Sequence, residues 1–363
     1  MNRSFVGAVA VAGLLFSTSV FAQPEIRFNG SAQYRIRANI DNGTNADGTD
    51  MPSVMNAHHQ YGWAFGVNAK ANDEVSVVLQ LENVGSNAYS TSVATNEGIY
   101  DGKNAGVILT RAYFAYTKGT FSFEGGIVPV SKNTTYDVGF HTINGDNYFN
   151  MSDGWNEIQS QAGMNLGYRA ADNLRMNLNL ATTGNQGRLI PDNDEQVLDG
   201  YRVGFTAPVT AGNLTITPAI QTESGIYKLD DTGNRIPGES NMMFAGGVDL
   251  RLRPASNLDL RAGVGIGNIE VEGQNERTSF LITLDPRFSL ANGRLVTAYS
   301  LAISNNDLNE VSYMMHYIDI NYTHNLNSNF SVRPRLRTYI RSNDTDDYNH
   351  TRLRPEVIFA ARF

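Results

Sequence analysis

The sequence contains no cysteine and few lysines, and both shortages limit what the protein can be. Without cysteine the chain has no disulfides and no lipid-modified N-terminal cysteine, although a secreted protein would often carry disulfides. The 28 basic residues divide into 23 arginines and five lysines. A solvated surface normally uses more lysine. The arginines therefore suggest fixed cations that form networks or face a ligand.

The sequence also contains no long apolar run after residue 22. The first 22 residues, MNRSFVGAVAVAGLLFSTSVFA, have an early positive charge, an apolar core and small residues before a break after Ala22. They predict a secretory signal peptide over 1–22 followed by one domain over 23–363. A membrane anchor fits less well, because the run is short and no stop-transfer pattern follows. Hydropathy alone would indicate a soluble exported protein, and a net charge of −8 argues against a nucleic-acid partner.

What the chain has in abundance is alternation of apolar and polar residues. Residues 25–40, EIRFNGSAQYRIRANI, place Ile, Phe, Tyr and Ala on one face and three arginines on the other. A period of two indicates a β-strand. The pattern recurs to the last residue, as in 258–266 and 330–341. It predicts sixteen strands, and a slip of the pattern between Tyr317 and Ile318 predicts a β-bulge.

The connections alternate between short and long. Tight turns such as 71–74, 117–120 and 290–293 separate long polar segments. The long segments are expected at 41–57, 84–105, 131–156, 183–198, 224–240, 268–276, 305–309 and 342–350. This rhythm is typical of an up-and-down antiparallel meander. A β-sandwich would also alternate, but it would place its charged face in water with more lysine. Apolar positions rich in aromatics near strand ends favour an all-β transmembrane barrel of sixteen antiparallel strands with long external loops.

The chain ends in RLRPEVIFAARF, an alternating strand that stops at Phe363. A terminal phenylalanine on the apolar face resembles the signal by which barrel proteins are handed to the outer-membrane assembly machinery. The alternative is an ordinary last strand that happens to end in phenylalanine.

Residues 109–137 resemble a segment of the Gram-negative general porin family. The matching residues are Arg111, Ala112, Phe114, Lys118-Gly119, Thr120 to Gly125 and Tyr136-Asp137. The resemblance implies an outer-membrane homotrimer whose third external loop folds into the lumen and narrows it. Two departures are the Gly125-Gly126 pair, where the family commonly has Gly-Arg, and the missing Pro-Glu-Phe-Gly-Gly motif, which leaves the geometry of the loop tip open.

The connection 131–156 is the candidate constriction loop, because it is long and carries three aromatics close together, Tyr148, Phe149 and Trp155. Packing against the inner wall would bury them. The loop would bring four carboxylates into the lumen: Asp137, Asp146, Asp153 and Glu157. The alternative is an external loop folded on its own apolar cluster.

A basic wall is expected opposite this loop. A closed barrel makes the fifteenth, sixteenth and first strands neighbours, so their inward arginines form one patch, with Arg111 further round the wall. The expected wall comprises Arg27, Arg35, Arg37, Arg111, Arg333, Arg335, Arg337, Arg341, Arg352, Arg354 and Arg362. Cations facing loop acids would set a transverse field that orients dipolar solutes. The alternative is a solvated lining without selectivity.

These patterns predict an outer-membrane channel for passive diffusion of small hydrophilic solutes and ions. The expected partners are outer-membrane lipids and lipopolysaccharide. The alternatives are a selective channel for anions or carboxylates and a plugged barrel with a structural or adhesive role. The six histidines are scattered, so neither a catalytic constellation nor a metal site is expected, and no cofactor is expected.

Overall fold

The protein is represented by a computed structural model of the whole chain. The structure describes residues 25–45, 47–83, 93–94, 107–129, 160–182, 201–229, 235–271, 274–306, 311–344 and 348–363. The expected signal peptide at 1–22 and the expected constriction loop at 131–156 lie outside these residues.

All regular structure in the described residues is β-strand. The strands are β1 Glu25–Thr44, β2 Asp50–Lys70, β3 Val75–Asn83, β4 Val93–Ala94, β5 Val107–Lys118, β6 Phe121–Pro129, β7 Ser160–Ala171, β8 Leu174–Thr182, β9 Tyr201–Thr206, β10 Val209–Ala211, β11 Leu214–Leu229, β12 Arg235–Ala255, β13 Leu258–Val271, β14 Gln274–Leu290, β15 Gly293–Asn306, β16 Val311–Asn325, β17 Phe330–Asn343 and β18 Asn349–Arg362. Within the described residues, no helix is long and apolar enough to cross a membrane.

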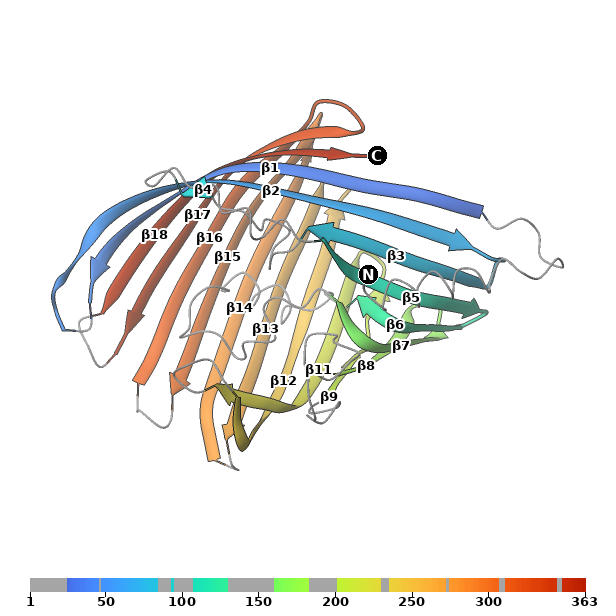
Figure 1. Ribbon diagram of the computed structural model, residues 1–363, viewed down its shortest axis with the longest axis horizontal. Helices are drawn as coiled ribbons and strands as arrows, with labels where there is room; N and C mark the ends of the chain where they lie inside the picture. Colours follow the sequence, from blue (N-terminus) through green and yellow to red (C-terminus); the bar gives the residue numbers. More distant parts are fainter. Residues whose placement is uncertain are drawn as a thin grey trace.

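The strands close into a barrel by pairing antiparallel with their sequence neighbours. The last strand then pairs with the first, from Ser31 opposite Arg362 to Thr44 opposite Asn349. In Figure 1 the blue first strands and the red last strands therefore lie side by side. Closure leaves no edge, so each of the sixteen strands of the barrel wall finds a hydrogen-bonding neighbour on both sides.

The barrel has the sixteen strands that the sequence predicts, although eighteen segments are assigned. Strands β9 and β10 act as one barrel strand, which Ala207 and Pro208 interrupt because proline has no N–H to give to the ladder. Strand β4 has two residues and pairs with His58 and His59 of β2. The closed sixteen-stranded antiparallel fold is confirmed.

Several connections are shorter than expected because the strands continue into polar sequence. The chain between β1 and β2 spans 45–49, not 41–57, and the connections after β11 and β13 shorten to 230–234 and 272–273. Backbone pairing does not require apolar side chains, so the ladder extends past the apolar band. Asp41 consequently lies on a paired strand opposite Arg352.

The bulge expected at Tyr317 and Ile318 is absent. β16 pairs with β15 in one continuous register from Val311 to His324. The alternation seemed to slip because two inward positions, Met315 and Tyr317, are apolar or aromatic and fully buried. Sequence alone does not distinguish a change of face from large side chains packed on the inner face.

The distribution of apolar and charged side chains in the barrel is the reverse of that in a water-soluble protein. Large apolar side chains on the outward face are exposed, including Phe28, Ile266, Phe244, Tyr201 and Leu336. Charged side chains on the inward face are buried, among them Arg35, Asp319, Arg341 and Glu356. So much outward apolar surface exceeds what a protein surrounded by water tolerates. It is typical of a barrel surrounded by hydrocarbon.

Candidate functional site

The inward faces of β16, β17, β18 and β1 carry a connected group of charged and aromatic residues, here called the seam network. Its members are Arg35, Arg37, Asp41, Tyr317, Asp319, Arg335, Arg337, Tyr339, Arg341, His350, Arg352, Arg354 and Glu356. Strand alternation points each member inward, and the register brings them together, with Arg37 opposite Glu356, Arg337 opposite Arg354 and Asp319 opposite Arg337.

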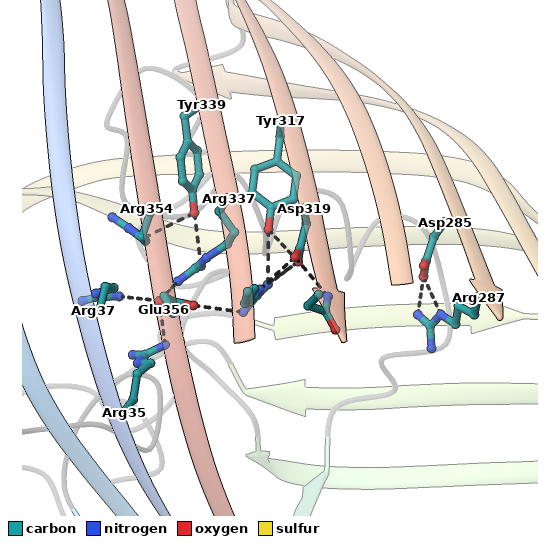
Figure 2. A network of polar contacts seen from close by, with 12 residues as sticks. Arg35, Arg37, Asp285, Arg287, Tyr317, Asp319, Arg337, Tyr339, Arg354 and Glu356 are labelled. Atoms are coloured by element: carbon teal, nitrogen blue, oxygen red, sulfur yellow. Dashed lines mark hydrogen bonds and ion pairs between the residues drawn. The ribbon is translucent and has the colours of Figure 1, made fainter. Parts of the chain in front are cut away.

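Glu356 is the centre of the network. Its side chain is fully buried, and its Oε1 lies 3.5 Å from Arg35 Nη1 and 3.7 Å from Arg37 Nη1. Arg337 donates a hydrogen bond to the same oxygen, while Oε2 lies 3.6 Å from Arg335 Nη1. Figure 2 shows Arg35 and Arg37 from β1 and Arg337 from β17 converging on this one carboxylate. Four cations therefore share one anion.

Asp319 forms the second anchor. Arg335 Nε donates to both of its carboxylate oxygens, at 2.9 and 3.0 Å, and Nη2 donates to Oδ2 as well. Asn321 and Tyr317 complete the shell, with donor–acceptor distances of 3.0 and 3.2 Å. A fork-like Arg–carboxylate pair with two further donors is a strong and well-oriented arrangement.

Tyr339 organises the arginines above Glu356. Its hydroxyl oxygen accepts from Arg337 Nη1 at 3.2 Å and from Arg354 Nη1 at 3.3 Å. The guanidinium carbons of Arg354 and Arg341 lie 5.1 and 5.5 Å from the ring centroid, within cation–π range. Arg354 Nε also donates to Asn39 at 2.7 Å. The ring thus holds cations that would otherwise repel one another.

Asp41 is the third carboxylate. It accepts from Arg352 Nε at 2.6 Å and contacts His350 Nε2 at 2.8 Å. His350 Nδ1 lies 2.8 Å from Arg341 Nη1. Because a guanidinium only donates, Nδ1 accepts, and Nε2 carries the proton that is donated to Asp41. The histidine therefore couples Arg341 to the carboxylate on the first strand.

The seam network contains seven arginines and three carboxylates. These four strands therefore present an excess of positive charge to the lumen. Asp319 and Glu356 are buried and Asp41 is half-buried, which costs free energy that close pairing offsets, and removing one partner of a buried pair is strongly destabilising. Partly buried cations of this kind attract anions more strongly than fully exposed ones do.

Most of the expected basic wall lies where the sequence placed it. Arg35, Arg37, Arg335, Arg337, Arg341, Arg352 and Arg354 belong to the seam network, and Arg333 lies on the inward face of β17 next to it. Three residues do not join them. Arg362 is exposed at the end of β18, where it lies opposite Ser31. Arg27 is at the tight-turn end, where its exposed side chain pairs with Glu25 at 2.6 Å, and Arg111 is on β5 opposite Gln80.

The tight-turn end around Arg27 has its own small set of ion pairs. Lys70 Nζ lies 2.8 Å from Asp73 Oδ1, and this hydrogen bond and charge lower the pKa of the exposed Asp73 carboxyl. Lys118 lies 3.4 Å from Glu74. Exposed pairs like these contribute little to stability. Arg27 therefore belongs to a solvated rim and lies outside the seam network.

The remaining expected residues divide between described and undescribed parts of the chain. Asp137, Asp146, Asp153 and Glu157 lie outside the described residues. Phe363 is described and outward, with 69% of its surface exposed. The group of three or more His, Cys, Asp or Glu side chains that a metal ion would need does not occur in the part of the chain that the structure describes.

Sequence reasoning missed the residues that hold the arginines in place. Glu356 alternates with the arginines of its own strand, so its inward direction was readable, but its central position depends on closure. Asp41 fell in an expected loop, and Asp319 followed the expected bulge. Neither Tyr317 nor Tyr339 was among the expected wall residues, yet both are buried beside the arginines.

Comparison with solved structures identifies this architecture. A loop-deletion mutant of OmpT, an outer membrane protein of Vibrio cholerae, aligns at TM-score 0.62 and 10% identity over 94% of this chain and all of that one. The anion-selective porin from Comamonas acidovorans aligns at 0.61 and 10% over the same shares. The outer membrane channel DcaP of Acinetobacter baumannii aligns at 0.58 and 12%, over 96% and 99%.

The fold is that of the Gram-negative outer-membrane porins. No protein-family model matches the sequence, and no curated protein matches it either. At 10–12% identity the likeness is one of fold. The porin fold nevertheless accounts for the exposed apolar and buried charged side chains, since in such a barrel apolar side chains contact lipid and polar ones line a lumen.

Proposed function

We propose that the protein is an outer-membrane porin, a water-filled channel for passive diffusion of small hydrophilic solutes and ions. The observation that carries the proposal is the seam network. A closed barrel that only needed to persist in a membrane would have little use for seven inward arginines around three carboxylates, two of them buried. A water-filled lumen makes such side chains tolerable, and sixteen strands enclose one.

The proposed location of the protein is the outer membrane. The chain is exported with a signal peptide cleaved after Ala22 and is inserted into the outer membrane by the barrel assembly machinery, which reads Phe363. Its outward face contacts lipid and its loops contact lipopolysaccharide. A homotrimer is the expected assembly, in line with the trimer form described for OmpT of Vibrio cholerae. Enzymatic activity is not part of the proposal.

The connection after β6 narrows the lumen in this proposal, and its acids Asp137, Asp146, Asp153 and Glu157 face the seam network. Support comes from inward side chains on the described strands. Val128, Leu281 and Met315 point into the barrel, yet each has no exposed surface. Apolar side chains on the wall of an open lumen would be wet, so their burial favours a cover on the lumen side.

Selectivity for anions or carboxylates is the second candidate function. It is favoured by the excess of arginines in the seam network, whose paired acids leave the wall cationic. The likeness to an anion-selective porin is consistent with it, although that title describes the other protein.

The test is the reversal potential of the purified protein in a planar bilayer under a salt gradient. Stepwise conductance with a potential that favours anions supports both the channel and the role of the seam network. Conductance with a potential that favours cations supports the channel but contradicts anion selectivity. Folded protein without conductance contradicts the channel and supports a plugged, structural barrel.

A further inference from the structure

The seam network contains one histidine, His350, which lies near the long-loop end of β18. An unperturbed imidazole changes its charge at about pH 6.5, whereas carboxylates do so at about pH 4 and arginine keeps its charge throughout. In mildly acidic water, His350 is therefore the member of the network whose charge can change.

Three charged side chains face the imidazole from the described strands. Arg341 on β17 places Nη1 2.8 Å from Nδ1, and Asp41 on β1 places Oδ1 2.8 Å from Nε2. Arg352, two residues further along β18, donates from Nε to the same Asp41 oxygen at 2.6 Å. The ring therefore bridges β17 and β1 across the last strand.

The backbone holds the ring at this place. His350 lies opposite Gly43 on β1, and a Cβ on Gly43 would be 2.1 Å from the carbonyl oxygen of Asn349 and 2.9 Å from His350 Cα. Such a close approach leaves the two strands little room to shift. The His350 side chain keeps 10% of its surface exposed, so water and protons reach it.

The contact with Arg341 holds only while His350 is neutral. A guanidinium has donors and no acceptor, so Nδ1 must accept. Protonation makes Nδ1 a donor, and two N–H groups and two positive charges then oppose each other across the 2.8 Å contact. The Nε2 contact with Asp41 persists, since Nε2 donates in both forms of the ring. Protonation therefore repels Arg341 and leaves His350 paired with Asp41.

We propose that His350 is a specificity-determining residue of the channel. When neutral, it holds Arg341 against the wall. When protonated, it releases Arg341 from that position and adds one positive charge to the seam network, so the lumen prefers anions more strongly in mildly acidic water. This role rests on the proposed channel and makes the selectivity of that channel depend on pH.

The reversal potential of the full-length protein in a planar bilayer, under one salt gradient at about pH 7.5 and at about pH 5.5, tests this role. We expect the anion-to-cation permeability ratio to rise about twofold on acidification, because one charge acting across about 7 Å of water changes local ion concentrations by roughly that factor. Carboxylates with ordinary pKa values lose their charge mainly below this interval.

His350→Gln separates the proton from the hydrogen bonds. A glutamine amide offers an acceptor to Arg341 and a donor to Asp41 but does not titrate. The variant should show the same permeability ratio at both pH values. His316→Gln is the matched control, because His316 lies on the outward face of β16 with Nδ1 2.9 Å from the hydroxyl oxygen of Tyr299. The control should retain the shift.

Two further variants move the midpoint of the pH dependence in opposite directions. Arg341→Gln removes the cation that opposes protonation of Nδ1, so the shift should occur at higher pH. Asp41→Asn removes the carboxylate that favours the charged ring, so the shift should occur at lower pH. A histidine that served only as a neutral bridge would give neither change, and these two variants decide the matter even if His350→Gln does not fold.

The role of His350 is overturned if the native protein shows no shift, if the shift persists in His350→Gln, or if the two midpoints move in the same direction. Conductance without the shift contradicts the role of His350 alone. Absence of conductance at both pH values contradicts the channel and this role with it.

Discussion

The ring of Phe363 lies against Gly30, where the last strand meets the first. A Cβ on Gly30 would be 2.3 Å from Phe363 Cζ, so the ring occupies the place of a side chain. The two residues also exchange backbone hydrogen bonds, from Gly30 N to Phe363 O at 2.8 Å and from Phe363 N to Gly30 O at 3.1 Å. The terminal residue thus closes the barrel with its backbone and with its ring.

Gly30→Leu should weaken this closure. The new side chain displaces the Phe363 ring, whose packing is worth about 1–2 kcal/mol. We expect the folded form to convert to the unfolded form at a lower temperature, read from its gel mobility after heating. Gly246→Leu is the control, because the nearest atom to a Cβ there is 3.7 Å away. Equal losses in the two variants would contradict a specific role for the Gly30–Phe363 contact.

Glu356→Gln should be among the most destabilising single changes on the inner wall. It removes the one carboxylate that Arg35, Arg37, Arg335 and Arg337 approach, at a cost of about 3–5 kcal/mol. Urea unfolding of the refolded protein measures this loss in the free energy of unfolding. Glu25→Gln, which breaks the exposed pair with Arg27, should cost no more than about 1 kcal/mol. A small effect at Glu356 would mean that the four arginines are stabilised without it.

Charge changes at Asp319 and Arg335 should move ion selectivity in opposite directions. Asp319→Asn removes a negative charge from the seam network and should strengthen anion preference. Arg335→Ser removes a positive charge, exposes Asp319 and should weaken that preference. The reversal potential under a salt gradient gives the sign of each change. Arg27→Gln, at the solvated rim, should change the potential less than either. A shift of the same sign in both variants would contradict control by the seam network.

Gly126→Ala should destabilise the barrel through the backbone. Gly126 has a φ of 130°, and a Cβ there would lie 2.3 Å from the carbonyl oxygen of Ala112. Strain of this kind costs about 1–3 kcal/mol before the steric overlap is relieved. Gly119→Ala, in a turn at φ 60° with no atom within 4 Å, should cost less. Urea unfolding measures the free energy of unfolding of each variant and so compares the two losses. Any side chain at position 126 would meet the same contact.

The amino-acid sequence determined the architecture of the wall. Alternation with a period of two assigned each residue to an inner or outer face, and tight turns gave the number of strands. Inward arginines such as Arg335 and Arg337 were therefore correctly predicted, because direction on a strand is a local property. The same reasoning failed where inward residues are aromatic, as at Tyr317, and where strands continue into polar sequence, as at Asp41.

The tertiary structure alone decided which charges meet. Arg35 and Glu356 are 321 residues apart in the chain, and only closure of the barrel brings them within 3.5 Å. Closure also places Phe363 on Gly30 and turns a row of arginines into a network held by three inward acids. Sequence periodicity specifies the face on which a side chain lies. The register between distant strands specifies its neighbours, and it is the neighbours that determine the electrostatics of a pore.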